Sequence, residues 1–155
     1  MNFNYQKARD IMVENQLRPN KIKDPNILNI FKKKPKESFL PENLERLSYV
    51  DMDITLSKNR GYLKNLHLAQ IIKHANIRKN HKILHIGALT GYVTSLISEL
   101  CLKVYAIEED EKHLSILNDN IKKNQIQNIN ILDKSFEFGS KLNAPFDRII
   151  IDCPI

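Results

Sequence analysis

The sequence is short of the features that mark membrane, secreted and repeat proteins. No apolar run approaches the roughly 20 residues that span a bilayer, and no internal repeat or low-complexity segment is present. Residues 1–5 lack the basic start, apolar stretch and small-residue cleavage site of a signal peptide. Cys101 and Cys153 are the only cysteines, too few for a disulfide framework. We therefore expect a protein of the reducing cytoplasm without a membrane segment.

Length and charge indicate an ordinary globular unit. A chain of 155 residues, 42% of them hydrophobic, buries about two thirds of its unfolded surface, enough for a core without metal or disulfide links. The net charge of +6 raises the question of a nucleic-acid partner, but the lysines are spread along the chain apart from residues 32–36. We interpret them as a solvated surface. Nucleic-acid binding is kept as an alternative, which predicts a steep loss of affinity with salt.

Residues 1–65 are expected to form a cap segment of short helices joined by polar loops. A first helical apolar pattern stops before Pro19, and Asp24-Pro25 is typical of the start of a second helix. Another short helix is expected after Pro41, whereas residues 52–64 show no sustained period and predict a loop or irregular strand. The apolar residues that carry the first two patterns are Ala8, Ile11, Met12, Leu17, Ile27, Ile30 and Phe31.

From residue 66 onward helical and strand patterns alternate. The expected helices cover residues 66–75, 92–100 and 111–123, and the expected strands cover residues 82–86, 103–107, 129–132 and 148–151. Parallel strands need crossover connections, so this alternation predicts an α/β fold with a mostly parallel sheet and helices on both faces. We expect residues 66–155 to form this domain, together with residues 1–65 as one structural unit.

The most informative segment is the buried strand 83–86, which ends at Gly87 and passes through Gly91 into a helix. Such a turn lets backbone N–H groups approach a ligand closely. Glu108 ends the following strand, 108 − 87 = 21 positions after Gly87, the interval at which an acid can accept hydrogen bonds from ribose hydroxyls. The structural alternative is that the glycines allow tight packing and that Glu108 caps the helix beginning near residue 110.

A dinucleotide-binding fold is a rival interpretation of the same turn. The G-x-G-x-x-G pattern of those folds requires glycine at positions 89 and 92. The chain has Leu89 and Tyr92 there. A nicotinamide or flavin dinucleotide is therefore disfavoured.

Several segments together resemble the protein-L-isoaspartate O-methyltransferase family. Residues 83–92, ILHIGALTGY, are similar to its V-L-D-V-G-x-G-T-G-Y motif, and Ala106-Ile107-Glu108 is similar to its second-strand acid. The remaining elements occur in the family's order and at similar spacing. They are residues 11–17 (M-V-x-x-Q-L), 24–28 (D-P-x-V-L), 35–41 (P-R-E-x-F-V-P) and 144–147 (A-P-Y/F-D).

The resemblance implies a Rossmann-like methyltransferase fold that uses S-adenosylmethionine and acts on isoaspartyl residues of proteins or peptides, or on another carboxylate acceptor. The donor is a sulfonium and the acceptor carboxylate is ionised near neutral pH, so no general base is required, and we assign no catalytic residue. By position, Gly87, Ala88, Thr90 and Gly91 face the amino-acid part of the donor and Glu108 its ribose. Asp133 lies beside the adenine or, alternatively, caps the turn that follows it.

Three positions depart from the family motifs. The strand-one acid is His85 and the middle glycine is Leu89. The T-I-S signature, which in the resemblance helps to hold the isoaspartyl substrate, falls at Gly61-Tyr62-Leu63 and lacks both hydroxyl residues. A branch with another acceptor, or a binding module without catalysis, is therefore the alternative to the enzyme. Tyr62 and Tyr92 either line the pocket or pack in the core.

Family members continue for several strands and helices beyond the fourth strand, so we expect the chain to be a partial version of the family fold. In the expected strand order 3-2-1-4, residues 148–151 form an apolar open edge that favours self-association. The substitution Ile150→Lys is expected to reduce that association. No metal site is expected, because no Cys or carboxylate spacing completes a zinc pattern around His67, His74, His81 and His85.

Overall fold

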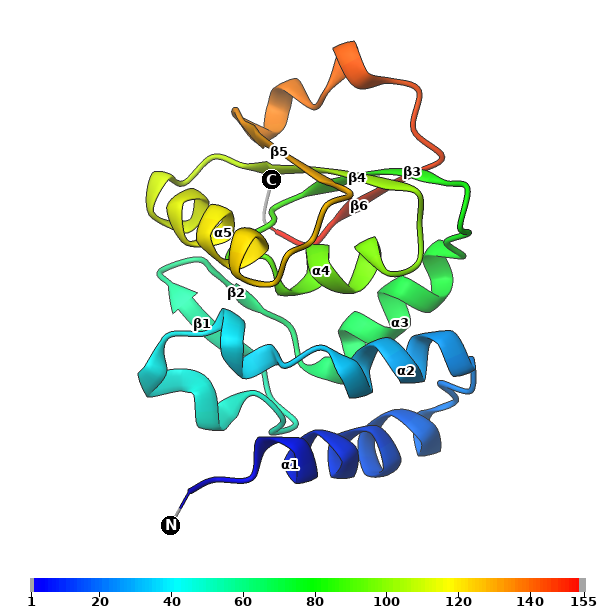
Figure 1. The fold of residues 1–155 in the computed structure, drawn as a ribbon, viewed down its shortest axis with the longest axis vertical. Helices are drawn as coiled ribbons and strands as arrows, with labels where there is room; N and C mark the ends of the chain where they lie inside the picture. Colours follow the sequence, from blue (N-terminus) through cyan, green and yellow to red (C-terminus); the bar gives the residue numbers. More distant parts are fainter. Residues whose placement is uncertain (1, 154–155) are drawn as a thin grey trace. The chain divides into compact units, whose positions relative to one another are not determined.

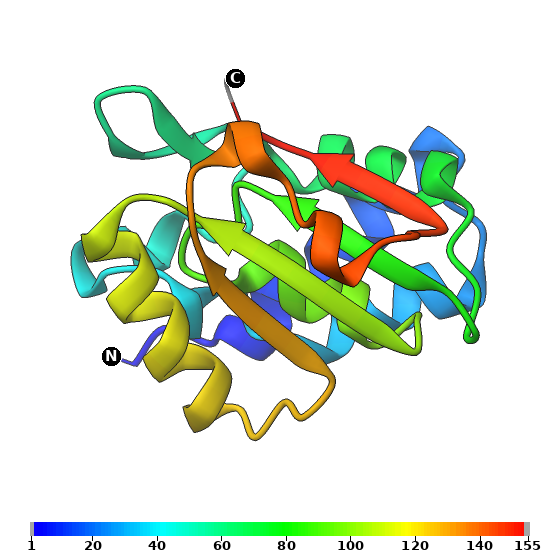
Figure 2. The same cartoon turned by 90° about the horizontal axis from the view of Figure 1, so that it is seen from above.

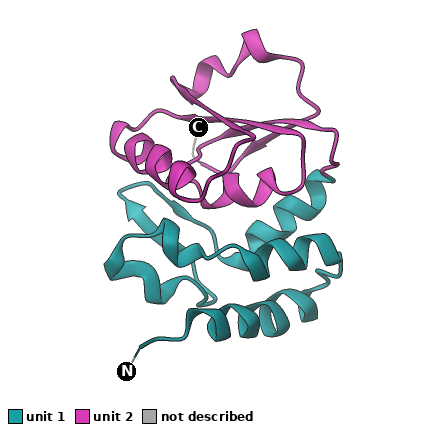
Figure 3. Ribbon diagram, viewed as in Figure 1, with its two compact units in different colours: residues 1–76 teal, residues 77–155 magenta. Residues whose placement is uncertain are grey.

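The computed structural model describes residues 2–153. The chain divides into two compact units, residues 1–76 and 77–155 (Figure 3). The domain boundary expected at residues 65 and 66 falls at the start of helix α3 (Asn65–Ala75), which packs against helices of the first unit. Within residues 2–153, no helix is both long and apolar enough to cross a membrane.

The first helix of the N-terminal unit buries a different face from the one predicted. Helix α1 (Tyr5–Met12) continues directly into the π-helix η1 (Val13–Leu17) and the 3-10 helix η2 (Arg18–Asn20). Met12 and Leu17 are buried as expected, but Ile11 is 49% exposed and Arg9 is buried in its place. The prediction that Ile11 belongs to the buried face was wrong, because a pattern of apolar residues cannot indicate that an arginine is buried.

Arg9 is buried because a polar network receives its guanidinium. Its Nη2 donates to Glu37 at 2.7 Å and its Nε to the Tyr49 hydroxyl at 2.8 Å. Tyr49 in turn donates to Glu37. Burial is the main cause that raises the pKa of Tyr49, and the Glu37 carboxylate adds to it. The network ties α1 to the chain that follows the second helix.

The second helix forms as the sequence predicts. The Asp24 side chain accepts a hydrogen bond from the N–H of Asn26 and begins α2 (Pro25–Lys33), which buries Ile27, Leu28, Ile30 and Phe31. The 3-10 helices η3 (Lys36–Phe39) and η4 (Glu42–Leu47) follow, so the helix expected after Pro41 is 3-10 in type.

An antiparallel hairpin, β1 (Ile54–Ser57) and β2 (Arg60–Tyr62), occupies the segment expected to be a loop or irregular strand. Its register shifts between Thr55 and Ser57.

The C-terminal unit is a four-stranded parallel sheet, seen face-on in Figure 2. Its strands are β3 (Lys82–Ile86), β4 (Lys103–Glu108), β5 (Ile129–Asp133) and β6 (Arg148–Ile151), in the order β5-β4-β3-β6. The α/β class, the strand positions and the order 3-2-1-4 expected from the sequence are confirmed.

Helices cover both faces of this sheet, with α-helices on one face and short 3-10 helices on the other. Helices α4 (Tyr92–Ser98) and α5 (Glu111–Lys123) lie on one face (Figures 1 and 2). Two crossovers of the same hand that proceed in the same direction across a sheet place their helices on the same side. The connection from β5 to β6 crosses the other face with the 3-10 helices η5 (Phe136–Phe138) and η6 (Lys141–Asn143).

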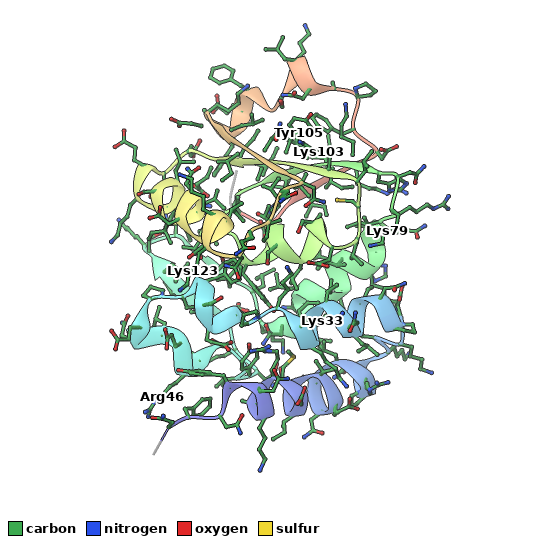
Figure 4. All side chains as sticks on the ribbon, in the orientation of Figure 1. Lys33, Arg46, Lys79, Lys103, Tyr105 and Lys123 are labelled. Atoms are coloured by element: carbon green, nitrogen blue, oxygen red, sulfur yellow. The ribbon has the colours of Figure 1, made fainter. Side chains whose placement is uncertain are left out.

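The core of the second face gathers around Phe136. Its side chain packs with Leu84, Ile86 and Ile107, and Phe146 joins the cluster. The Tyr105 ring, labelled in Figure 4, meets the Phe146 ring edge-on at 5.7 Å between centroids. Short turns therefore cover part of this face.

Strand β6 has one buried and two exposed isoleucines. Ile150 is 4% exposed, whereas Ile149 and Ile151 are 58% and 43% exposed. Successive side chains of a strand point to opposite faces. Ile149 and Ile151 therefore lie on the exposed face of the strand, whereas Ile150→Lys, the variant expected to test edge association, would place its charge on the buried face.

Candidate functional site

The turn after β3 requires glycine at position 87. Gly87 has φ +90°, and a Cβ there would lie 2.6 Å from both Cβ and Sγ of Cys153. The N–H groups of Gly87 and Ala88 both donate to the carbonyl of Ile107, at 3.0 and 3.1 Å. The first part of the turn is thus fastened to β4.

The second part of the turn makes hydrogen bonds within the turn and to helix α5. Gly91, at φ +100°, precedes α4 and its N–H donates to the Ala88 carbonyl at 2.9 Å. The Thr90 carbonyl accepts from the Asn120 side chain of α5 at 2.8 Å. Ala88 and Thr90 are 1% and 2% exposed. The structure thus brings all four predicted residues into one buried turn.

Leu89 adopts a backbone conformation suited to the glycine of the family motif. Its φ is +51°, a left-handed conformation that costs a non-glycine residue about 1–2 kcal/mol. The side chain is 1% exposed, and burying a leucine contributes about 1.5–3 kcal/mol. Packing therefore offsets the backbone strain, and the turn keeps its shape without glycine at this position.

Glu108 is the central acid of the site. Its carboxylate is fully buried and accepts three backbone hydrogen bonds, from Leu89 at 2.7 Å, Glu109 at 3.1 Å and Asp110 at 3.0 Å. These bonds hold the carboxylate at the carboxyl end of β4, beside the turn after β3. The alternative that Glu108 caps α5 is wrong, because Asp110 is the cap and accepts from the His113 N–H at 2.9 Å.

Asp133 ends β5 directly beside Glu108 in the sheet register. It is exposed. The turn-cap interpretation of Asp133 is not supported, because the N–H of Phe136 at the start of η5 donates to Glu109 at 3.0 Å. The side chains of Glu108 and Asp133 thus start from neighbouring positions at the carboxyl edge of the sheet.

His85 belongs to a buried polar chain that the sequence did not reveal. Its Nδ1 lies 2.9 Å from the Thr94 hydroxyl, and its Nε2 lies 2.9 Å from Oδ1 of Asp152. The His85 and Asp152 side chains are 0% and 4% exposed. An acid that directly follows a parallel strand stands where ligands bind in such sheets, and that signal could have identified Asp152.

The segment that corresponds to the family's T-I-S signature lies in the N-terminal unit. A Cβ on Gly61 would lie 2.1 Å from the Ile54 carbonyl oxygen and 2.9 Å from Cα of Thr55. A hydroxyl residue at position 61 would therefore require the facing strand to move. Tyr62 is 2% exposed, which agrees with packing.

Lys36 is buried next to this segment. Its Nζ donates to Asn65 Oδ1 at 3.0 Å and lies 5.6 Å from the centre of the Tyr62 ring. Burial lowers the pKa of Lys36 to about 7, against an opposing effect of Asp53. Sequence patterns gave no sign of it, because a lysine is almost never fully buried.

The other residues considered in the sequence analysis are Tyr92, the possible metal ligands and the basic side chains. Tyr92 is fully buried at the start of α4. Over residues 2–153, no three His, Cys, Asp or Glu side chains are arranged to hold a metal ion. Basic side chains come from several elements of both units, and those labelled in Figure 4 are Lys33, Arg46, Lys79, Lys103 and Lys123.

Known proteins with similar sequences share one enzyme name. The chain is 28% identical over 145 residues to a protein-L-isoaspartate O-methyltransferase of Methanoculleus marisnigri, covering 94% of this chain and 66% of that protein. It is 31% identical over 109 residues to one of Petrotoga mobilis, covering 70% of this chain and 51% of that protein. The chain thus spans about half to two thirds of the length of these relatives.

Solved structures with the same name share the fold. One protein-L-isoaspartate O-methyltransferase superposes with a TM-score of 0.79 at 20% identity, covering 96% of this chain and 47% of the other. A Plasmodium falciparum protein described as a β-aspartate methyltransferase, in complex with S-adenosyl-L-homocysteine, superposes with a TM-score of 0.76 at 19% identity, covering 97% and 73%. These likenesses show the Rossmann-like methyltransferase fold.

A family model decides the assignment, because it matches residues 7–154, nearly the whole chain. The match includes the Gly87 turn and Glu108 as well as the helical N-terminal segment. The chain belongs to the protein-L-isoaspartate(D-aspartate) O-methyltransferase (PCMT) family.

Proposed function

We propose that this chain binds S-adenosylmethionine and carries out methyl transfer to a carboxylate of an isoaspartyl residue in a protein. Family membership and the complex of the Plasmodium relative with S-adenosyl-L-homocysteine support the donor. The single observation that carries the proposal is the buried Glu108 carboxylate, which lies at the end of β4 and accepts a hydrogen bond from Leu89 in the turn after Gly87. A cytoplasmic location, expected from the cysteine content, is part of the same proposal.

The residues fit the chemistry of the donor. Glu108 would accept the ribose hydroxyls, and the turn formed by Gly87, Ala88, Thr90 and Gly91 would hold the amino-acid part. Asp133, next to Glu108 in the register, would contact the adenine. A bound donor supplies a methyl group activated by its sulfonium. The acceptor carboxylate is already ionised near neutral pH, so the chain's own contribution is to hold the reactants in line and to exclude water.

Donor binding is testable by isothermal titration calorimetry. S-adenosyl-L-homocysteine is expected to bind far more tightly than NAD, and Glu108→Ala to weaken it by about 10-fold or more, since hydrogen bonds to a charged group contribute about 1.5–3 kcal/mol. Glu108→Gln, of nearly equal size, separates lost charge from lost packing, and Glu137→Ala, at an exposed residue of η5, is the matched control. Equal binding of NAD and S-adenosyl-L-homocysteine would contradict the proposal.

A binding module without this catalysis is the second candidate, and Gly61 favours it. The 2.1 Å approach of a Cβ to the Ile54 carbonyl leaves no room for a hydroxyl side chain there. Transfer of a radiolabelled methyl group to an isoaspartyl peptide distinguishes the two. Turnover well above that of Gly87→Val, whose side chain collides with Cys153, rejects the module. Tight donor binding with turnover equal to that variant rejects the enzyme.

A further inference from the structure

A chain of three buried polar side chains connects α4, β3 and the residue after β6. The Thr94 hydroxyl lies 2.9 Å from His85 Nδ1, and His85 Nε2 lies 2.9 Å from Asp152 Oδ1. Thr94 and His85 are fully buried, and the Asp152 side chain is 4% exposed. Because all three side chains are buried, their polar atoms depend on one another for hydrogen-bond partners.

One tautomer of the imidazole satisfies both contacts in this chain. The Thr94 hydroxyl can donate to Nδ1, and Nε2–H then donates to Asp152. His85 then occupies one of the roughly four acceptor positions of the Asp152 carboxylate. A buried charge is stable in proteins when a charge of opposite sign or a metal ion meets it. The arrangement therefore favours a cationic ligand at Asp152.

Asp152 stands beside the turn of the proposed donor site. Ile151, the residue before it, pairs with Ile86 in the sheet, and Asp152 Oδ1 lies 3.5 Å from where a Cβ on Gly87 would be. Glu108 ends the strand on the other side of β3. Two buried carboxylates thus flank the Gly87 turn, one from β4 and one following β6.

The two carboxylates match the two ends of the donor. S-adenosylmethionine has a ribose diol near its adenine and an α-ammonium group at the other end of its amino-acid part. The sulfonium lies between these two ends, so with the ribose at Glu108 the α-ammonium group is the cation at the far end of the donor, and we assign it to Asp152. The family motif has an acid at position 85, where this chain has His85, and in this chain the carboxylate comes from the residue after β6.

We propose that Asp152 binds the α-ammonium group of the donor and that His85, held by Thr94, is a positioning residue that aims the Asp152 carboxylate. The inference rests on the proposed function. It adds the residue that distinguishes a ligand with a free amino group from one without it.

Calorimetry with a pair of ligands isolates this contact. The probes are S-adenosyl-L-homocysteine and its analogue in which hydrogen replaces the α-amino group. The wild-type protein is expected to prefer the amino ligand by about 10- to 100-fold, since the bond joins two charged groups. Asp152→Asn is expected to reduce this ratio to about 1 while binding of the deamino analogue changes little. Glu137→Gln, an exposed acid of η5, should keep the wild-type ratio.

The positioning role of His85 has its own test. The double variant His85→Asp, Asp152→His exchanges the ends of the pair, and it is expected to recover a preference for the amino ligand that His85→Ala loses. Thermal denaturation confirms that each variant is folded. A wild-type ratio near 1 overturns this inference and leaves the proposed function standing. No binding of S-adenosyl-L-homocysteine by the wild type overturns both.

Discussion

Raising the pH from 7 to 9 is expected to increase the free energy of unfolding of this protein, and Lys36→Met is expected to remove most of that increase. The Lys36 side chain is fully buried, and burial lowers its pKa to about 7 from an ordinary 10.5. Between these values the unfolded chain binds a proton that the folded chain does not. The free energy of unfolding therefore rises with pH between about 7 and 10.5. This contribution is lost as the pH falls back to 7.

The expected change in the free energy of unfolding is large for a single residue. One pKa unit corresponds to about 1.4 kcal/mol, so the slope is about 1.4 kcal/mol per pH unit and the whole shift amounts to about 5 kcal/mol. The increase is expected to stop near pH 9, because an ordinary cysteine has a pKa of 9.0 and burial raises the pKa of Cys101 to about 11 in the folded protein. A thiol whose pKa is raised in the folded state stabilises below its unfolded pKa and loses this contribution at higher pH.

Guanidinium unfolding followed by far-UV circular dichroism at pH 7, 8 and 9 measures the effect. Lys33→Met, on the exposed side of α2 (Figure 4), is the matched control and should keep the wild-type slope. Met fills a similar volume at position 36, although it leaves Asn65 Oδ1 without its donor. An equal slope in Lys36→Met and wild type would show that Lys36 is charged in the folded protein at pH 7 and above.

A polypeptide of residues 1–155 is expected to self-associate through β6. This strand pairs with β3 on one side and is the last strand of the sheet formed by the described residues. It exposes Ile149 and Ile151, and neither lysine nor proline lies within it. Edge strands without such residues offer free N–H and C=O groups for pairing with another chain.

Two neighbouring substitutions separate association from folding. Ile149→Lys places a charge on a side chain that is 58% exposed, so it should reduce association and keep the fold. Ile150→Lys places the charge on a side chain that is 4% exposed, so it should destabilise the unit by several kcal/mol, as expected for an unpaired buried charge. Analytical ultracentrifugation decides the first point. A wild-type monomer at all concentrations would contradict it.

The sequence predicted most of the C-terminal unit because its elements are decided by local periodicity. Strand β3 and helix α5 begin and end where the pattern places them. The Gly87 turn and Glu108 were found for a similar reason, since their spacing along one strand-helix-strand unit is itself the signal. The roles proposed for them stay predictions.

The N-terminal unit was harder to predict because buried polar groups organise part of it. Arg9 occupies a place that the apolar pattern assigned to Ile11, since Glu37 and Tyr49 satisfy its guanidinium. A polar residue can be buried only if partners are present. Those partners come from later in the chain, so the first helix alone does not specify which face is buried.

The α/β class and the family motifs of the donor turn could be predicted from the sequence, because each depends on residues close together in the chain, and the strand order followed from the family resemblance. Tertiary structure alone decided which polar side chains meet. His85 and Asp152 are 67 positions apart and Lys36 and Asn65 are 29 apart. Strand pairing in one case and helix and loop packing in the other bring them within 3.0 Å. Side-chain hydrogen bonds act over such short distances only, and no local pattern records them.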